Sequence, residues 1–232
     1  MIESGELMAK VAEAGTTPKV RRSAGRPRLR DRGVPATESI LDLALQIFGR
    51  NGFEGTNIAD IAREAGVAKP LIHYHFETKE KLWQAAVAHA MGKLSAEFAN
   101  INFELRDLDQ IAQLSVVLRR FTYYCARNHA VTNIIIQEVV RGTERAKWLT
   151  TTYVEPMFTL VEGLLNAVAE TGKIRKVDPA HFLPMLQGAV NGFFAFSTML
   201  SSRYGIDALS DEMVRAHAEL VVDVFLSWLR VP

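Results

Sequence analysis

Cysteine is almost absent from this sequence, which holds a single one, Cys125. One cysteine cannot form a disulfide within the chain, and it cannot supply a zinc site built from several cysteines. A chain without structural disulfides is typical of a reducing compartment. Because Cys125 lies in an apolar run, we interpret it as a small buried hydrophobic residue rather than as a redox sensor.

Long apolar runs are also missing. The most apolar segment, residues 193–200, is interrupted by Ser197 and Thr198 and is too short to span a bilayer. The N-terminus carries charged residues from Glu3 onward with no apolar stretch behind them, so it does not resemble a secretory signal. We therefore expect a soluble, cytoplasmic protein without a membrane partner.

Strand patterns are missing as well, because valine and isoleucine never alternate with polar residues between turn signals. From residue 36 onward, apolar residues recur at helical spacing instead. We predict an all-α protein of about nine helices, with a three-helix head and a larger helical body. The expected helices cover roughly residues 37–52, 57–65, 68–76, 78–99, 111–127, 130–140, 144–170, 178–200 and 210–229, with a loop at 100–109.

The net charge is only +1, but its distribution is uneven. Residues 1–35 lack apolar periodicity, and we interpret them as a flexible tail followed by a basic arm. Residues 19–32 hold seven basic residues and one acidic residue, whereas residues 36–82 hold five basic and seven acidic ones. Positive charge concentrated in one arm indicates a polyanionic partner.

The arm contains the sequence Gly25-Arg26-Pro27-Arg28, which resembles the core of an AT-hook. Proline keeps such a segment extended, and arginines fit the narrow minor groove of A·T-rich DNA. We expect Arg26, Arg28 and Arg30 to contact DNA, and whether they read the minor groove or only phosphates stays open. Deleting residues 1–32 should flatten the salt dependence of binding, by about 0.9 in log–log slope for each lost phosphate contact.

Two short helices flank Gly66-Val67 and have the dimensions of a helix-turn-helix. The second is about two turns long, which suits a major groove roughly 12 Å wide. The segment combines particular residues at particular positions. They are Thr37-Glu-Ser-Ile-Leu41, Ala44, Phe48, Gly52-Phe53-Glu-Gly-Thr56-Asn57, Ile61-Ala62, Ala65-Gly66-Val67 and Ile72-His-Tyr-His-Phe76, then Lys79. In these positions, segment 36–82 resembles the DNA-binding domain of the TetR family of transcriptional regulators.

The resemblance implies roles for single residues. Asn57 would cap the second helix at the phosphate backbone, and Lys79 would hold a phosphate at the start of the fourth helix, where the helix dipole favours an anion. The third helix would then place its side chains against base edges and phosphates. The residues expected to contact DNA are Asn57, Lys69, Pro70, Leu71, His73, Tyr74, His75 and Lys79.

The sequence departs from the family pattern at three positions. Ala68 stands where a serine-like cap is usual, and Pro70 stands where glycine is common but proline is acceptable in a first turn. His73 replaces the usual tyrosine, which would make its contact depend on pH. Leu71 either meets a thymine methyl group or packs into the core.

Catalytic patterns are absent. The sequence has no Gly-x-Ser-x-Gly turn and no glycine-rich phosphate loop before a helix. His73 and His75 are two residues apart and therefore lie on different faces of a helix, which argues against a metal pair. We expect no enzymatic activity, no cofactor and no metal.

The body, residues 83–232, has no motif of its own. The resemblance implies that it binds an effector and forms a homodimer through its last two helices. Small residues in 178–200 permit close helix approach, and residues 210–229 supply apolar area. The residues expected at the dimer interface are Gly188, Gly192, Phe225, Trp228 and Leu229.

Aromatic and amide residues on apolar helix faces are candidates for an effector pocket, because a buried amide needs a partner. Ordinary core packing explains each of them equally well. Their character indicates a largely apolar small-molecule effector. The candidates are Phe121, Tyr124, Gln137, Trp148, Tyr153, Met157, Gln187, Asn191 and Phe194.

The sequence therefore predicts a ligand-responsive transcriptional regulator, a repressor, that binds a pseudo-palindromic operator as a dimer and is released by a small molecule. One alternative is a constitutive or architectural DNA-binding protein without an effector. Activation in place of repression also stays open.

Overall fold

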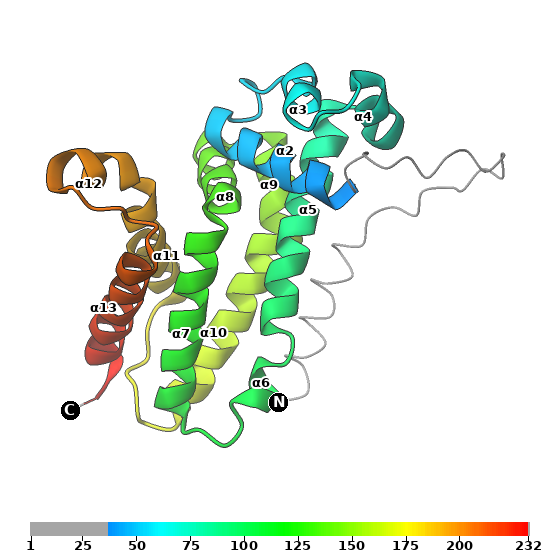
Figure 1. Ribbon diagram of the computed structural model, residues 1–232. Helices are drawn as coiled ribbons and strands as arrows, with labels where there is room; N and C mark the ends of the chain where they lie inside the picture. Colours follow the sequence, from blue (N-terminus) through cyan, green and yellow to red (C-terminus); the bar gives the residue numbers. More distant parts are fainter. Residues whose placement is uncertain (1–36, 232) are drawn as a thin grey trace.

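The computed structural model describes residues 37–231, and this part of the chain is built of helices (Figure 1). It confirms the predicted all-α fold with a helix-turn-helix head on a larger helical body. The predicted tail and basic arm, with Arg26, Arg28 and Arg30, lie outside the described residues. None of the described helices combines the length and apolar character that a membrane span needs.

The head consists of α2 (Thr37–Asn51), α3 (Ile58–Glu64) and α4 (Lys69–Phe76). The apolar residues of α2 recur at helical spacing, and that face is buried. Asn57 caps α3, its side-chain oxygen accepting a hydrogen bond from the Ala59 amide at 2.9 Å. Thr78 caps the next helix in the same way, through the Lys81 amide at 3.1 Å. Both caps follow from local sequence signals.

The body is an assembly of longer helices below the head (Figure 1). Helix α5 leads down from the head, and α11, α12 and α13 form one side of the body. Helix α9, a π-helical turn and α10 follow one another without a break, as predicted for 144–170. The elements are α5 (Lys79–Phe98), α6 (Ile101–Glu104), α7 (Gln110–Arg127), α8 (His129–Arg141), α9 (Glu144–Leu149), η1 (Thr150–Val154), α10 (Glu155–Glu170), α11 (Pro179–Ala195), α12 (Ser197–Tyr204) and α13 (Asp211–Leu229).

Two helix predictions need correction. The segment expected to be a loop at 100–109 contains the short helix α6. The helix expected to run through 178–200 stops at Ala195, because Phe196 has φ −87° and ψ 12° and so leaves the helical geometry. The chain turns there and continues as α12, which ends at Gly205 with φ +69°.

The described residues have two main apolar cores. The first joins the head to the upper body, because Phe48 of α2, Trp83 of α5, Ile134 of α8 and Tyr153 of η1 are buried in it together. The second lies lower, among α7, α10, α11 and α13. The predicted boundary between head and body, at residue 82, falls within α5 and within the first core.

Candidate nucleic-acid interface

The helix-turn-helix is held from behind by apolar contacts. Gly66 adopts φ +67°, a left-handed conformation that glycine takes at little cost, and this lets the chain turn between α3 and α4. Ile61 of α3 and Ile72 of α4 are fully buried, and Phe76 closes the end of α4 against the core. The inner side of α4 is therefore fixed, and its outer side is free to meet a partner.

The outer side of α4 carries residues that the sequence assigned to DNA contact. Tyr74 is 79% exposed, and its ring lies edge-on to that of His75, 5.3 Å away. His73, Lys69 and Pro70 are also exposed, whereas Leu71 is half-buried. Tyrosine and histidine donate hydrogen bonds, so this face fits the donor-rich contacts made to phosphates and base edges.

The start of α4 lacks a side-chain cap. Ala68 occupies the N-cap position without a side-chain hydrogen bond, and Pro70 stands in the first turn. No side chain at the N-cap position therefore offsets the positive end of the helix dipole.

A hollow of about 390 Å³ opens beside this helix start. Lys79 forms part of its wall, with Nζ 3.0 Å from the Thr56 carbonyl oxygen and 4.4 Å from the centre of the Phe53 ring. These contacts keep Lys79 half-buried, so Lys69 is the more accessible cation of the two. The hollow is lined by Glu54, Gly55, Thr56, Asn57, Ile58, Lys69, His73 and Lys79.

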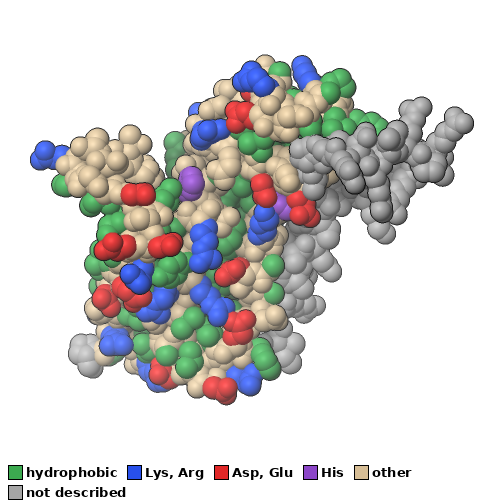
Figure 2. Space-filling view, viewed as in Figure 1, with side chains coloured by type: hydrophobic (Ala, Val, Ile, Leu, Met, Phe, Trp, Pro, Cys, Tyr) green, Lys and Arg blue, Asp and Glu red, His purple; other side chains and the backbone are tan. Residues whose placement is uncertain are grey.

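The charges on the remaining surface are mixed. On the face seen in Figure 2, basic and acidic side chains are interspersed over the body. Within the head, Arg50 pairs with Glu64 and Arg63 with Asp60, so these cations are partly neutralised. The cationic character of the hollow therefore depends on Lys69 and Lys79.

The residues predicted to form an effector pocket are divided between the two cores. Trp148 and Tyr153 pack in the first core, with ring centres 5.5 Å apart, and Phe121 and Phe194 belong to the second. Met157 is half-buried on α10. The sequence could not foresee this division, because the two cores are separated by tertiary packing rather than by helix periodicity.

Three polar members of that set, Tyr124, Asn191 and Gln137, make side-chain hydrogen bonds within the protomer. The Tyr124 hydroxyl donates to the Ala90 carbonyl at 2.9 Å, and burial raises the pKa of this phenol. The Asn191 side chain donates to the Gln187 carbonyl at 3.0 Å. The Gln137 amide donates to the Gly49 carbonyl at 3.1 Å, and this hydrogen bond connects α8 of the body to α2 of the head.

Tyr153 differs from these residues. Its side chain is 1% exposed, its hydroxyl has no hydrogen-bond partner, and burial raises its pKa to about 12. It lies on the π-helical turn η1, a local geometry that is frequent at functional sites. A buried hydroxyl without a partner is costly unless something else supplies one.

The predicted dimer residues fall into two groups. Gly188 and Gly192 face open space, because a Cβ atom added at either would meet nothing within 4 Å. Phe225 and Leu229 are instead buried within the protomer, on the inner side of α13. Trp228 is partly exposed and stacks on Phe182 of α11. On α11 and α13, Met185, Leu220 and Val224 are exposed apolar residues that the sequence analysis did not assign to the interface.

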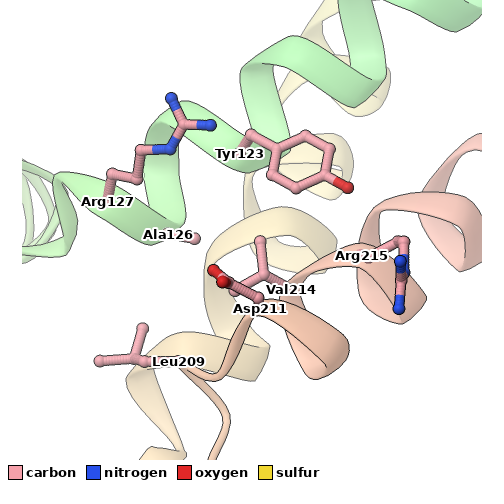
Figure 3. Close-up of a pocket in the computed structure, with 7 residues that line it drawn as sticks. All are labelled: Tyr123, Ala126, Arg127, Leu209, Asp211, Val214 and Arg215. Carbon is pink, nitrogen blue, oxygen red and sulfur yellow. The ribbon is translucent and has the colours of Figure 1, made fainter.

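A second hollow, of about 260 Å³, lies between the end of α7 and the start of α13 (Figure 3). Arg127 and Arg215 extend from these two helices on opposite sides, and their guanidinium groups do not converge (Figure 3). The hollow therefore lacks the paired geometry of a specific anion site.

The sequence analysis did not predict an ion cluster at the junction of head and body. Arg145 of α9 lies 3.3 Å from Glu138 of α8 and 3.3 Å from Glu54 of the head, and its guanidinium covers the Phe53 ring at 3.7 Å. Glu80 of α5 is a further neighbour at 3.7 Å. Glu54 and Glu80 are distant from Arg145 in the sequence, so no local pattern indicates the cluster.

The chain matches two family models. One describes bacterial regulatory proteins of the tetR family and matches residues 40–86. The other describes the tetracyclin repressor-like C-terminal domain and matches residues 111–232.

Known proteins are similar over most of the chain. The HTH-type transcriptional regulator RutR of Escherichia coli is 22% identical over 202 residues, which is 87% of this chain and 94% of that protein. The fold is shared with the fatty acid degradation regulator FadR from Bacillus halodurans, with a TM-score of 0.62 at 19% identity, covering 84% of this chain and all of that one. It is also shared with FadR from Bacillus subtilis in complex with stearoyl-CoA, with a TM-score of 0.61 at 18% identity, covering 82% and 98%. Because the second family model alone spans more than half of the chain, this protein belongs to the tetR family and is a transcriptional regulator.

Proposed function

We propose that this regulator is a dimeric repressor that leaves its operator when a small, largely apolar effector binds in the body. The observation that carries the proposal is the first core, in which the DNA-facing head and the unpartnered Tyr153 hydroxyl of the body are packed together. A group bound at Tyr153 would therefore act on residues that also position α2 and α5.

DNA binding is proposed for the outer side of α4, with Lys69, His73, Tyr74 and His75 contacting bases and phosphates. The unfilled N-terminus of α4 and the hollow at Lys79 support a phosphate contact there. Two such heads, related by a two-fold axis, fit successive major grooves of a pseudo-palindromic operator. The basic arm is proposed to add sequence-independent affinity.

Dimerisation is proposed through the exposed face of α11 and α13, at Gly188, Gly192, Leu220, Val224 and Trp228. The two helices run side by side, since Phe182 stacks on Trp228 at one end and His217 contacts the Ala189 carbonyl toward the other. Glycines on one helix and apolar side chains on the other allow close packing in a four-helix bundle.

The effector is proposed to be apolar with one hydrogen-bonding group, which Tyr153 would meet among Trp148 and Trp83. A regulator of this fold, FadR of Bacillus subtilis, forms a complex with stearoyl-CoA, and the apolar acyl chain of that ligand supports an apolar effector here. Ligand binding would favour a head spacing that no longer fits the operator.

The test uses an operator selected from random DNA and a library of apolar carboxylates, thioesters and phenols. We expect the dimer to bind the operator, and one ligand class to raise the melting temperature while releasing DNA. Tyr153→Phe should fold at least as stably as the wild type, because it removes a buried hydroxyl without a partner, yet it should lose the response to that ligand.

Tyr124→Phe is the matched control. It should lower stability by about 1 kcal/mol, because it removes a satisfied hydrogen bond, and keep the ligand response. A protein that binds the operator but responds to no ligand would point to the constitutive alternative. Failure to bind any selected DNA would overturn the proposal.

A further inference from the structure

Helix α12 has no core of its own. None of its eight residues is buried, and it projects from the end of α11 away from the rest of the body (Figure 1). Yet the helix and the residue before it carry large apolar side chains: Phe196 is 60% exposed, Met199 46% and Tyr204 63%.

Such a helix does not hold itself together in water. Isolated helices shorter than about 12 residues are marginal even with alanine-rich sequences. Five of the eight residues of α12 are serine, threonine or tyrosine, which have weaker helix propensity than leucine, methionine or arginine. Its order therefore requires a contact that the described residues of one protomer do not supply.

The exposed apolar surface of α12 continues an exposed stripe on α11. Met185, Gly188, Gly192 and Phe196 follow one another at intervals of three or four residues, which places them on one side of the helix. Met199 comes three residues later, just past the bend. The stripe runs beside Leu220, Val224 and Trp228 on α13, which are also exposed.

The α11–α13 face alone is modest for a stable dimer. It offers four large apolar side chains, at Met185, Leu220, Val224 and Trp228, between patches of glycine. A typical specific interface needs about 800 Å² from each partner. Phe196 and Met199 would add two more large side chains at one edge of the same face.

We propose that α12 is an arm that packs against a second copy of this chain, at the edge of the α11–α13 face. This rests on the dimer of the proposed function. If both heads contact one DNA duplex, the two-fold axis of the dimer runs along the direction from head to body. Each α12 then contacts the second copy at the same height along that axis. The interface is then closed by two symmetric arms.

The first test places a charge on the apolar side of the arm. Met199→Asp is expected to raise the dimer dissociation constant at least tenfold in sedimentation experiments, because a carboxylate would be buried in the interface. Ser201→Asp puts the same charge on the other side of α12 and should stay within twofold of the wild type. Both positions are exposed in the protomer, so circular dichroism should show that the helices other than α12 stay folded in both variants.

The second test measures hydrogen exchange above and below the dimer dissociation constant of the wild type. Amides 199–204 should be protected in the dimer and lose that protection in the monomer. The proposal would be overturned if the Met199→Asp variant formed a dimer as tight as that of the wild type. It would also be overturned if hydrogen exchange in α12 were the same above and below the dimer dissociation constant. Operator binding by the wild-type dimer, measured in parallel, keeps such a failure distinct from failure of the proposed function.

Discussion

Arg145 connects three elements through one side chain. Its side chain is 13% exposed and that of Glu138 only 3%, so the pair is buried at the junction of head and body. The Thr143 hydroxyl also donates to the Glu138 carboxylate, at 2.6 Å. Arg145→Met would leave this carboxylate without its cation, and we expect a loss of roughly 3–5 kcal/mol in the free energy of unfolding, measured with urea.

Lys147→Met on the same helix is the control for Arg145. Lys147 pairs with Glu144 at the surface, so its loss should change stability by less than about 0.5 kcal/mol. The double variant Glu138→Met with Arg145→Met should recover part of the loss, because no charge stays buried. Equal losses for Arg145→Met and Lys147→Met would contradict this account.

His217 links α13 to α11. Its Nε2 lies 3.0 Å from the Ala189 carbonyl oxygen, its ring stacks on Phe193, and burial lowers its pKa below the ordinary value near 6.5. The unfolded chain therefore binds a proton more readily than the folded chain does. We expect the free energy of unfolding to fall as the pH drops below about 6.5, and the fall to level off below the folded-state pKa.

His217→Gln isolates this contribution from the other histidines. Glutamine keeps an amide donor but does not titrate, so urea unfolding at pH 7.5 and pH 5.5 should show a smaller acid loss than in the wild type. An acid loss of the same size in both proteins would assign it to other groups.

At the residue scale, the sequence predicts contacts between near neighbours, such as helix caps, but not contacts between residues far apart in the chain. The caps at Asn57 and Thr78 depend on residues two or three positions away, so the sequence could predict them. The Gln137 amide bonds to Gly49, 88 positions away, and only the packed structure reveals this. The buried state of Phe225 and Leu229 was missed for the same reason, since an apolar residue on α13 can face either core or partner.

At the scale of helices, Gly49 controls how closely α2 approaches α8. A Cβ atom added there would lie 2.8 Å from the Ala130 carbonyl oxygen and 2.9 Å from its Cα atom, so the backbone of one helix must move. We expect Gly49→Ala to lower stability by about 1–3 kcal/mol, despite the better helix propensity of alanine. Thermal unfolding measures this.

Gly92→Ala tests the same substitution in open space. A Cβ atom at Gly92 on α5 meets nothing within 4 Å, so the variant should gain up to about 1 kcal/mol from helix propensity. If both variants gained stability, close packing of α2 on α8 would not be limiting.

Helix periodicity explains which elements were predicted and which were not. Segment 144–170 keeps one apolar stripe, so it was predicted as a single long segment, but the π-helical turn inside it leaves no clear mark on that pattern. The bend at Phe196 was missed because Met199 and Leu200 continue the apolar pattern across it. A pattern of side chains cannot show that the helix beyond them has nothing to pack on.

At the scale of the whole molecule, head and body share a core and ion pairs. A conformational change in one of them therefore alters the packing of the other. Tyr153 contacts Trp148, which packs on Trp83 near the start of α5. A ligand that favours another arrangement of this core would shift the populations of head positions without a separate linker. In the proposed repressor, the operator response depends on the dimer, because the spacing between heads is defined only when two heads are present.

Gly188→Trp tests that dependence. A Cβ atom added there meets nothing within 4 Å in the protomer, but the ring would enter the α11–α13 face, where overpacking costs about 1–3 kcal/mol. Since about 1.4 kcal/mol is tenfold in affinity, the dimer dissociation constant should rise about tenfold or more, and operator binding should weaken with it. Gly163→Trp on α10, where an added Cβ atom also meets nothing within 4 Å, should leave both unchanged. A Gly188→Trp dimer as tight as that of Gly163→Trp would move the interface away from α11.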